Sequence, residues 1–151
     1  MADADPYAQW SAMLRRSAPF SLVLRGLGVV LAGYAVLWAG LLTIGLLGLA
    51  PDRILELDTR NALAFTPWGA RIGVYVWAIG MLAGVTALIA QRAVAPVLIM
   101  VGFAAHLTVF LYLTANPYYD GFAGYPNLAL EIILLLTAMR AAQIALRSEQ
   151  T

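Results

Sequence analysis

The chain has 151 residues and a net charge of +1; 62% of the residues are hydrophobic and 11% are charged, and the mean hydropathy is +0.82. Soluble domains are roughly 45–50% apolar and about 25% charged. This chain therefore carries more apolar surface than one small core can bury, and lipid is the expected solvent for the excess. The sequence has no cysteine and one histidine, His106. These counts exclude disulfides, thiolate metal sites and iron–sulfur clusters, and they exclude a bis-histidine haem built from this chain alone.

The first 21 residues are polar and mixed in charge, but larger apolar side chains recur among them at helical spacing. These residues are Tyr7, Trp10, Met13 and Leu14. The pattern predicts a short amphipathic helix on the membrane surface, separated from the first span by Pro19. Because the apolar run that follows is too long for the core of a signal peptide, we expect it to be retained as a span.

Four apolar stretches follow, each close to the roughly 20 residues that a helix needs to cross a bilayer. They cover about residues 26–49, 71–90, 94–115 and 128–146. The loop 51–67 is expected to hold a short interfacial helix, and Gln91 and Arg92 form a tight turn. Proline, glycine and asparagine in Asn116–Asn127 (NPYYDGFAGYPN) predict a loop before the last span. The predicted fold is therefore all-α, a polytopic membrane protein built as a four-transmembrane-helix bundle.

Arginine placement predicts the orientation, because cytoplasmic segments of membrane proteins are enriched in basic residues. With the N-terminus inside, six arginines fall on the inner side: Arg15, Arg16, Arg25, Arg92, Arg140 and Arg147. Three fall outside: Arg53, Arg60 and Arg71. We therefore expect a cytoplasmic segment 1–21, a transmembrane domain 22–147 and a cytoplasmic tail 148–151. The arginine-only basic composition and the high alanine, glycine and leucine content indicate a GC-rich bacterial genome, and hence the bacterial inner membrane.

Glycines recur at regular spacing in the first two spans, where small residues let helix backbones approach each other. The first span carries Gly26, Gly33 and Gly40 at heptad spacing. The second carries Gly69, Gly73, Gly80 and Gly84, two GxxxG units on roughly one face. We expect spans one and two to form a tight antiparallel pair through these glycines. The alternative is that glycine is simply common in membrane helices.

His106 lies near the middle of the third span, roughly 15 Å from either end at 1.5 Å per residue. A polar side chain at that depth is costly and normally faces the interior of the bundle. One interpretation is a functional group: a proton relay, a haem or quinone ligand, or a substrate contact. The other is a neutral imidazole that hydrogen-bonds a neighbouring helix.

Two charged residues lie near the outer ends of their spans, Glu131 in span four and Arg71 in span two. Opposite charges at similar depth predict an ion pair that joins the two spans. The functional alternatives are a titrating Glu131 carboxylate in an outward-open cavity and an Arg71 that binds an anionic headgroup or a quinone oxygen. Trp38 and Tyr75 are candidates to line a cavity with His106, although aromatic residues in membrane bundles more often serve packing. Threonines within the spans are expected to bond back to their own helix carbonyls: Thr43, Thr86, Thr108 and Thr137.

The combination of length, span number and a glycine-rich first span, over Gly26–Leu146, resembles the DoxX-like group of small bacterial four-helix membrane proteins. The loops 51–60 and 116–127 match no pattern of that group. The resemblance implies a four-helix membrane fold and an association with redox complexes, and it assigns no functional residue.

No Walker loop, GxSxG, HExxH or dinucleotide fingerprint occurs, and no basic patch indicates a nucleic-acid partner. The sequence therefore favours a non-catalytic accessory protein or small subunit that binds a larger membrane complex of respiratory or photosynthetic type. One alternative is a small transporter or channel subunit that uses Glu131, Arg71 and His106 as a homo-oligomer, since four short spans rarely enclose a path alone. The other is a membrane redox protein that binds quinone or haem. No resident metal is predicted.

Overall fold

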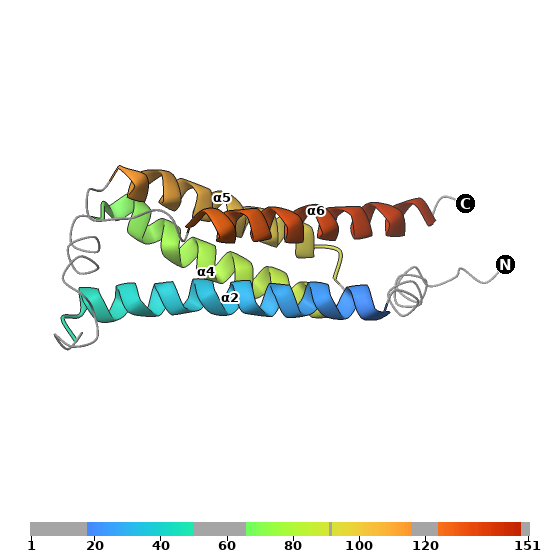
Figure 1. Ribbon diagram of the computed structural model, residues 1–151, viewed down its shortest axis with the longest axis horizontal. Helices are drawn as coiled ribbons and strands as arrows, with labels where there is room; N and C mark the ends of the chain where they lie inside the picture. The colour runs from blue at the N-terminus through green and yellow to red at the C-terminus, as the bar shows by residue number, and fades with distance from the viewer. Residues whose placement is uncertain (1–17, 50–65, 91, 116–123, 149–151) are drawn as a thin grey trace.

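Four long helices lie side by side in the computed structural model, which describes residues 18–49, 66–90, 92–115 and 124–148 (Figure 1). They are α2 (Ala18–Leu46), α4 (Trp68–Ile89), α5 (Ala95–Thr114) and α6 (Gly124–Ser148). Each contains a stretch of 20 to 25 residues that is long and apolar enough to cross a membrane. Every regular element in the described ranges is a helix. The prediction of an all-α bundle of four helices, each long and apolar enough to cross a membrane, is confirmed.

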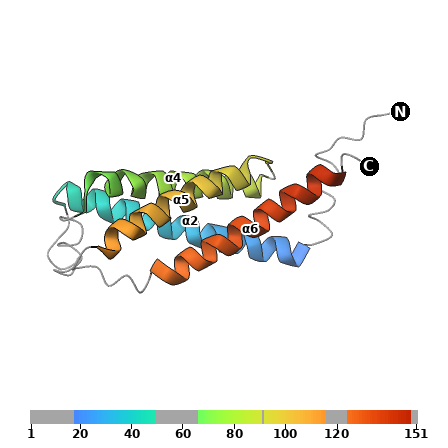
Figure 2. The same cartoon turned by 90° about the horizontal axis from the view of Figure 1, so that it is seen from above.

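The two ends of the bundle differ in which helix termini they hold. At the end that we call the terminal end, α2 begins, α4 turns into α5, and α6 finishes (Figures 1 and 2). At the opposite end, the loop end, α2 and α5 finish while α4 and α6 begin. Successive helices therefore run in opposite directions.

Helix α2 is displaced toward the N-terminus relative to the predicted span 26–49. It begins at Ala18, so Pro19 lies in its first turn, where a missing N–H costs no helical hydrogen bond. It ends at Leu46 because Gly48 adopts a left-handed φ of 66°. Leu49 N–H then donates to the Ile44 carbonyl at 3.1 Å, and Gly48 N–H donates to the Gly45 carbonyl at 3.2 Å. This pair of bonds satisfies carbonyls that a helix end otherwise leaves unpaired. The predicted amphipathic helix, with Tyr7 to Leu14, lies outside the described residues.

The other helix bounds follow the prediction more closely, with one correction. Helix α4 begins directly after Pro67, and α5 carries a proline in its first two positions. Both helices begin and end within three residues of the predicted limits, 71–90 and 94–115. Helix α6 begins at Gly124 rather than near residue 128, so the end of the predicted loop Asn116–Asn127 is helical. Pro126 does not prevent this, because it again falls in a first turn. The predicted interfacial helix in loop 51–67 and the turn residue Gln91 fall outside the described ranges.

The closest helix contact joins α4 and α5, and glycines form it. A Cβ added at Gly80 would lie 2.8 Å from the Gly102 backbone, and one added at Gly84 would lie 2.8 Å from the Ile99 backbone nitrogen. A Cβ at Gly73 would lie 2.6 Å from a methyl group of Val109. These distances are shorter than real side chains allow, so glycine is required for the approach. Gly73, Gly80 and Gly84 of span two therefore serve packing as predicted, but their partner is span three. Gly69 is exposed, and a Cβ there would meet nothing within 4 Å.

The predicted role of the span-one glycines is wrong. Gly26, Gly33 and Gly40 are exposed, and a Cβ at any of them would meet nothing within 4 Å. The buried face of α2 instead holds Leu24 and Leu31, which precede Gly26 and Gly33 by two residues. Two residues correspond to about 200° around a helix, so the two series face opposite ways. The glycine of α2 that does pack inward is the neighbouring Gly28, whose added Cβ would lie 3.1 Å from Val85.

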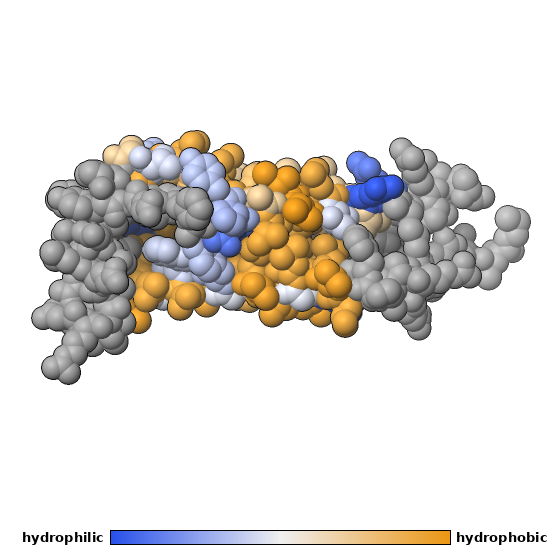
Figure 3. All heavy atoms as spheres, in the orientation of Figure 1, coloured by the Kyte–Doolittle hydropathy of each residue, from blue (hydrophilic) through white to orange (hydrophobic). Residues whose placement is uncertain are grey.

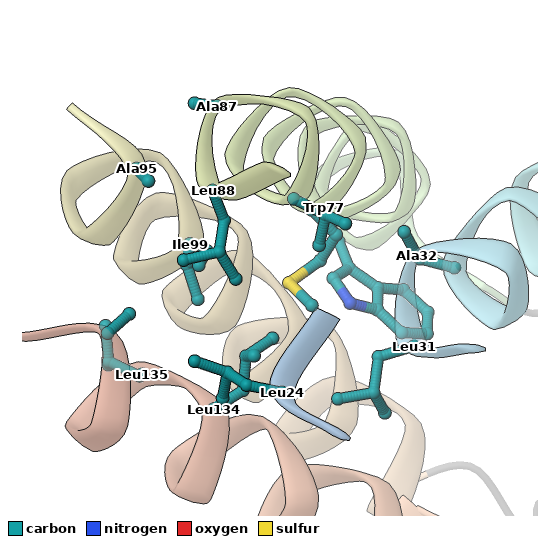
Figure 4. Close-up of a cluster of buried hydrophobic side chains, with 14 of the residues drawn as sticks. Leu24, Leu31, Ala32, Trp77, Ala87, Leu88, Ala95, Ile99, Leu134 and Leu135 are labelled. Atoms are coloured by element: carbon teal, nitrogen blue, oxygen red, sulfur yellow. The ribbon is translucent and has the colours of Figure 1, made fainter. Parts of the chain in front are cut away.

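A continuous apolar core fills the half of the bundle nearer the terminal end. Figure 4 shows side chains from all four helices directed into it, including Leu31, Leu88, Ile99 and Leu134. Leu31, Ile99 and Leu134 are at most 1% exposed. The outer surface is also apolar over much of this half, whereas residues of lower hydropathy gather toward the loop end on the face in Figure 3. On that face, residues of lower hydropathy lie mainly in the loop half, with a further hydrophilic side chain near the terminal end.

Candidate functional site

Glu131 is the centre of a hydrogen-bonded group that joins three helices. It comes from α6, and none of its surface is exposed. The Trp77 indole N–H of α4 donates to Glu131 Oε1 at 2.8 Å. His106 Nδ1 of α5 lies 2.8 Å from Glu131 Oε2. Each carboxyl oxygen therefore has a partner, as a carboxyl group inside a membrane requires.

Trp77 also fixes the orientation of the histidine ring. The Trp77 and His106 rings are stacked, with centroids 3.8 Å apart and planes 11° from parallel. The same indole thus stacks on one member of the pair and hydrogen-bonds the other. Because Trp can only donate, Glu131 Oε1 must be an acceptor. Any proton on the carboxyl group is therefore held at Oε2, next to His106 Nδ1.

The protonation of this pair is restricted by its surroundings. An uncompensated charge in hydrocarbon is costly, so the pair is most stable without net charge. In one such arrangement, ionised Glu131 accepts a hydrogen bond from an imidazolium. In the other, protonated Glu131 donates to Nδ1 of a neutral imidazole. The Nε2 atom of His106 carries a proton in both arrangements.

A cavity of about 30 Å³ lies beside His106 on the loop-end side of the bundle. It is lined by aromatic and aliphatic residues from all four helices: Tyr34, Trp38, Val74, Trp77, His106, Val109, Phe110, Leu113 and Gly124. A volume of 10–15 Å³ is roughly the minimum for one water molecule, so this cavity has room for one or two. The predicted sharing of a cavity by Trp38 and His106 is confirmed.

Edge-to-face aromatic contacts build the wall of the cavity. Tyr34 of α2 packs against Trp38 at 6.3 Å and against Trp77 at 5.9 Å between ring centroids. Trp77 and Tyr34 were not predicted as site residues, because an aromatic ring inside a membrane span usually signals packing. Trp77 does lie on the same helix face as Gly80 and Gly84, three and seven residues on, so its spacing could have placed it toward the interior.

The predicted ion pair between Arg71 and Glu131 is wrong. Arg71 Nε donates to the Thr66 carbonyl oxygen at 2.8 Å, and the guanidinium lies 5.2 Å from the Trp68 ring centroid. It therefore stays at the loop end of α4, near the start of the helix. Glu131 lies seven residues into α6, roughly 10 Å deeper than the helix start, and its two oxygens bond to Trp77 and His106 instead.

Tyr75 is absent from the cavity lining and has a structural contact instead. Its hydroxyl lies 2.9 Å from Thr43 Oγ1, which itself donates to the Ala39 carbonyl at 2.7 Å. Since the threonine proton is used there, Tyr75 is the donor in the bond that joins α4 to α2. The expected bonds from threonine hydroxyls to their own helix are confirmed for Thr43, Thr86, Thr108 and Thr137.

The site favours small ligands over large cofactors. Pockets for drug-sized ligands have volumes of about 300–1,000 Å³, well above this cavity, so haem or quinone binding at His106 stays a prediction that the cavity size does not favour. Among the described residues, no group of three or more His, Cys, Asp or Glu side chains is arranged to hold a metal ion. What the arrangement can do chemically is share one proton between Glu131 Oε2 and His106 Nδ1.

Comparison with family models, curated proteins and solved structures finds no match to this chain. The geometry around Glu131 is therefore the basis for proposing what the protein does.

Proposed function

We propose that this chain is a proton-binding subunit of the membrane, whose Glu131–His106 pair takes up and releases one proton from the loop end of the bundle. The observation that carries the proposal is the fully buried Glu131 carboxyl group, bonded at one oxygen to a fixed donor and at the other to a histidine. Ionisable residues inside membrane bundles commonly mark proton relays or substrate sites. A purely structural bond between helices would need neither a carboxyl group nor an imidazole.

The packing of the bundle supports uptake from one side only. Toward the loop end, the pair adjoins the cavity lined by aromatic and aliphatic residues. Toward the terminal end, the contact of Gly80 and Gly84 with α5 and the buried side chains of Met81 and Leu134 fill the interior. A single copy thus resembles a proton-binding site more than a channel, and net transport would require a partner.

Infrared difference spectroscopy tests proton binding directly, because a protonated carboxyl group absorbs apart from an ionised one. We expect spectra of liposome-reconstituted protein, recorded between acidic and alkaline pH, to contain a protonated carboxyl band that Glu131→Gln removes. The glutamine can still accept from Trp77 and donate to His106, so it is a control that keeps the hydrogen bonds. A band that survives in Glu131→Gln would contradict the proposal, and no band in wild type would show that Glu131 is ionised throughout and that His106 alone carries the proton.

A role as a small, non-catalytic subunit of a larger complex belongs to the same proposal. The exposed face of α2 with Gly26, Gly33 and Gly40 supports it, because small residues let a partner helix approach closely. Native mass spectrometry from lipid discs is the test. We expect wild type to carry an additional stoichiometric mass that Gly33→Leu loses; a multiple of 16.2 kDa would indicate a homo-oligomer. A single 16.2 kDa chain in both proteins would contradict association.

We propose that both chain ends face the cytoplasm of a bacterial inner membrane, which places the cavity on the outer side. The arginine distribution supports this orientation, and the DoxX-like resemblance stays a prediction consistent with it. Since the chain has no cysteine, single-cysteine variants report sidedness. An impermeant maleimide added to intact cells should label Ala115→Cys at the loop end and leave Arg92→Cys unlabelled. The reverse pattern would contradict the orientation.

A further inference from the structure

Three polar groups of the cavity lining have no hydrogen-bond partner in the described part of the chain. They are the Tyr34 hydroxyl, the Trp38 indole N–H and Nε2 of His106. His106 is buried, and Tyr34 and Trp38 are half-buried. Buried polar groups without a protein partner are normally satisfied by ordered water. A ligand in the cavity is therefore expected to form hydrogen bonds with these groups.

The chemistry of the three groups restricts what that ligand is. The Trp38 N–H can only donate, and His106 Nε2 carries a proton in both uncharged arrangements of the pair. A ligand here must therefore offer an acceptor oxygen. No carboxylate lies among the lining residues to attract a cation. The volume of about 30 Å³ limits the ligand to one or two atoms of the size of water.

We infer that this cavity binds one or two water molecules that connect the Glu131–His106 pair to the loop end. The inference rests on the proposed proton-binding function and adds the route. The cavity lining runs from His106 along α5 to Leu113 and includes Gly124, the first residue of α6. It thus extends from the buried pair to the point where α5 ends and α6 begins.

Release of the proton balances without any further reactant. The His106 Nε2 proton passes to a cavity water, and the resulting hydronium gives a proton to bulk water at the loop end. When the pair starts as protonated Glu131 and neutral imidazole, the Oε2 proton moves to Nδ1 in the same event. Both starting arrangements end as ionised Glu131 bonded to an Nδ1–H imidazole whose Nε2 is an acceptor. Uptake is the reverse.

Two variants on neighbouring positions of α5 test the route in the full-length protein. Leu113 lines the cavity, whereas Leu111 is 62% exposed on the outer surface. Leu113→Trp fills the cavity with a side chain, and Leu111→Trp is the matched control with the same change of residue. We expect hydrogen–deuterium exchange at the Glu131 carboxyl group to slow by about tenfold or more in Leu113→Trp, the effect on a rate of losing about one hydrogen bond. Leu111→Trp should exchange like wild type.

A second measurement identifies the ligand independently of proton exchange. We expect the infrared spectrum of wild type in phosphatidylcholine–phosphatidylglycerol vesicles to contain an O–H band that shifts in H₂¹⁸O and weakens in Tyr34→Phe. Equal exchange rates in Leu113→Trp and Leu111→Trp would overturn the route even if Glu131 binds a proton. A lipid carbonyl band that Tyr34→Phe alters, without an ¹⁸O-sensitive band, would show that lipid occupies the cavity and would overturn the water assignment. An ¹⁸O-sensitive band in a protein whose His106 Nε2 keeps its proton at alkaline pH would support the water site and refute the proposed function.

Discussion

The two halves of this bundle solve the same problem, helix association in lipid, by different means. The terminal half uses backbone proximity: Gly80 and Gly84 of α4 contact α5 directly, and apolar side chains fill what remains. The loop half uses polar bonds and aromatic rings: Trp77, His106 and Glu131 join three helices, and Tyr75 bonds Thr43. Lipid tails are as apolar as leucine, so either close contact or polar bonding is needed to hold helices together. Because the helices of the terminal half are in direct contact, that half stabilises the fold and closes the interior. The loop half can therefore hold a cavity.

The largest effect is expected where the terminal half is tightest. Gly80→Val places a side chain where even a Cβ lies 2.8 Å from the Gly102 backbone, so α4 and α5 must separate. Overpacking of this kind costs about 3 kcal/mol of unfolding free energy. The matched control is Gly69→Val, at an exposed position of the same helix with nothing within 4 Å, where we expect a change within about 0.5 kcal/mol. Denaturation in bicelles measures both, and equal effects at the two positions would refute the assignment of the α4–α5 contact.

The next effect comes from the buried carboxyl group of the loop half. Glu131→Leu leaves the Trp77 N–H and His106 Nδ1 without partners, and we expect it to cost about 2 kcal/mol. Glu131→Gln keeps an acceptor for Trp77 and a donor for His106, so most of that loss should be recovered. The same bicelle measurement applies. If glutamine destabilises as much as leucine, the pattern of donors and acceptors described around Glu131 is wrong.

Trp77→Phe separates stacking from hydrogen bonding within the same group. The phenyl ring can still pack on His106 but cannot donate to Glu131 Oε1. We expect a loss of about 1 kcal/mol together with a shift of the Glu131 carboxyl band in the infrared spectrum. An unchanged band would contradict the hydrogen bond between the indole and the carboxyl group.

The smallest effect is expected at the bond between α2 and α4. Tyr75→Phe removes the donor to Thr43 Oγ1, and interhelical hydrogen bonds in membranes contribute on average about 0.6 kcal/mol. Tyr112→Phe, at a position that is 52% exposed, is the matched control and should have no measurable effect. A loss of more than about 2 kcal/mol of unfolding free energy in Tyr75→Phe would exceed what one such bond supplies. It would contradict the assignment of a single hydrogen bond between Tyr75 and Thr43.

The sequence predicted the spans well because hydrocarbon requires long apolar helices, and that requirement is visible in one dimension. It predicted their ends less well, since Gly48 and the first-turn prolines Pro19 and Pro126 act through backbone geometry. The errors about Gly33 and the Arg71–Glu131 pair have different causes. The direction in which the Gly33 face points depends on which neighbour covers it, whereas the depth of Glu131 was misjudged because α6 begins at Gly124.

The site was therefore predicted in parts but not as a unit. His106 and Glu131 stood out because polar residues in apolar spans are rare, whereas their convergence depends on how α5 and α6 turn toward each other. Trp77 carried no such signal, since only its partner distinguishes a packing tryptophan from a hydrogen-bonding one. Its helix spacing with Gly80 and Gly84 was the available indication that it faces the interior.

The most direct test of the Glu131–His106 proton pair is ¹⁵N solid-state NMR of histidine-labelled protein, because the single His106 gives one signal from each ring nitrogen. We predict a proton-bearing Nε2 at acidic pH that becomes unprotonated on alkalinisation, and a displacement of the Nδ1 signal in Glu131→Gln. Two signals that remain the same in wild type and Glu131→Gln would contradict the claim that this carboxyl group shares a proton with the imidazole.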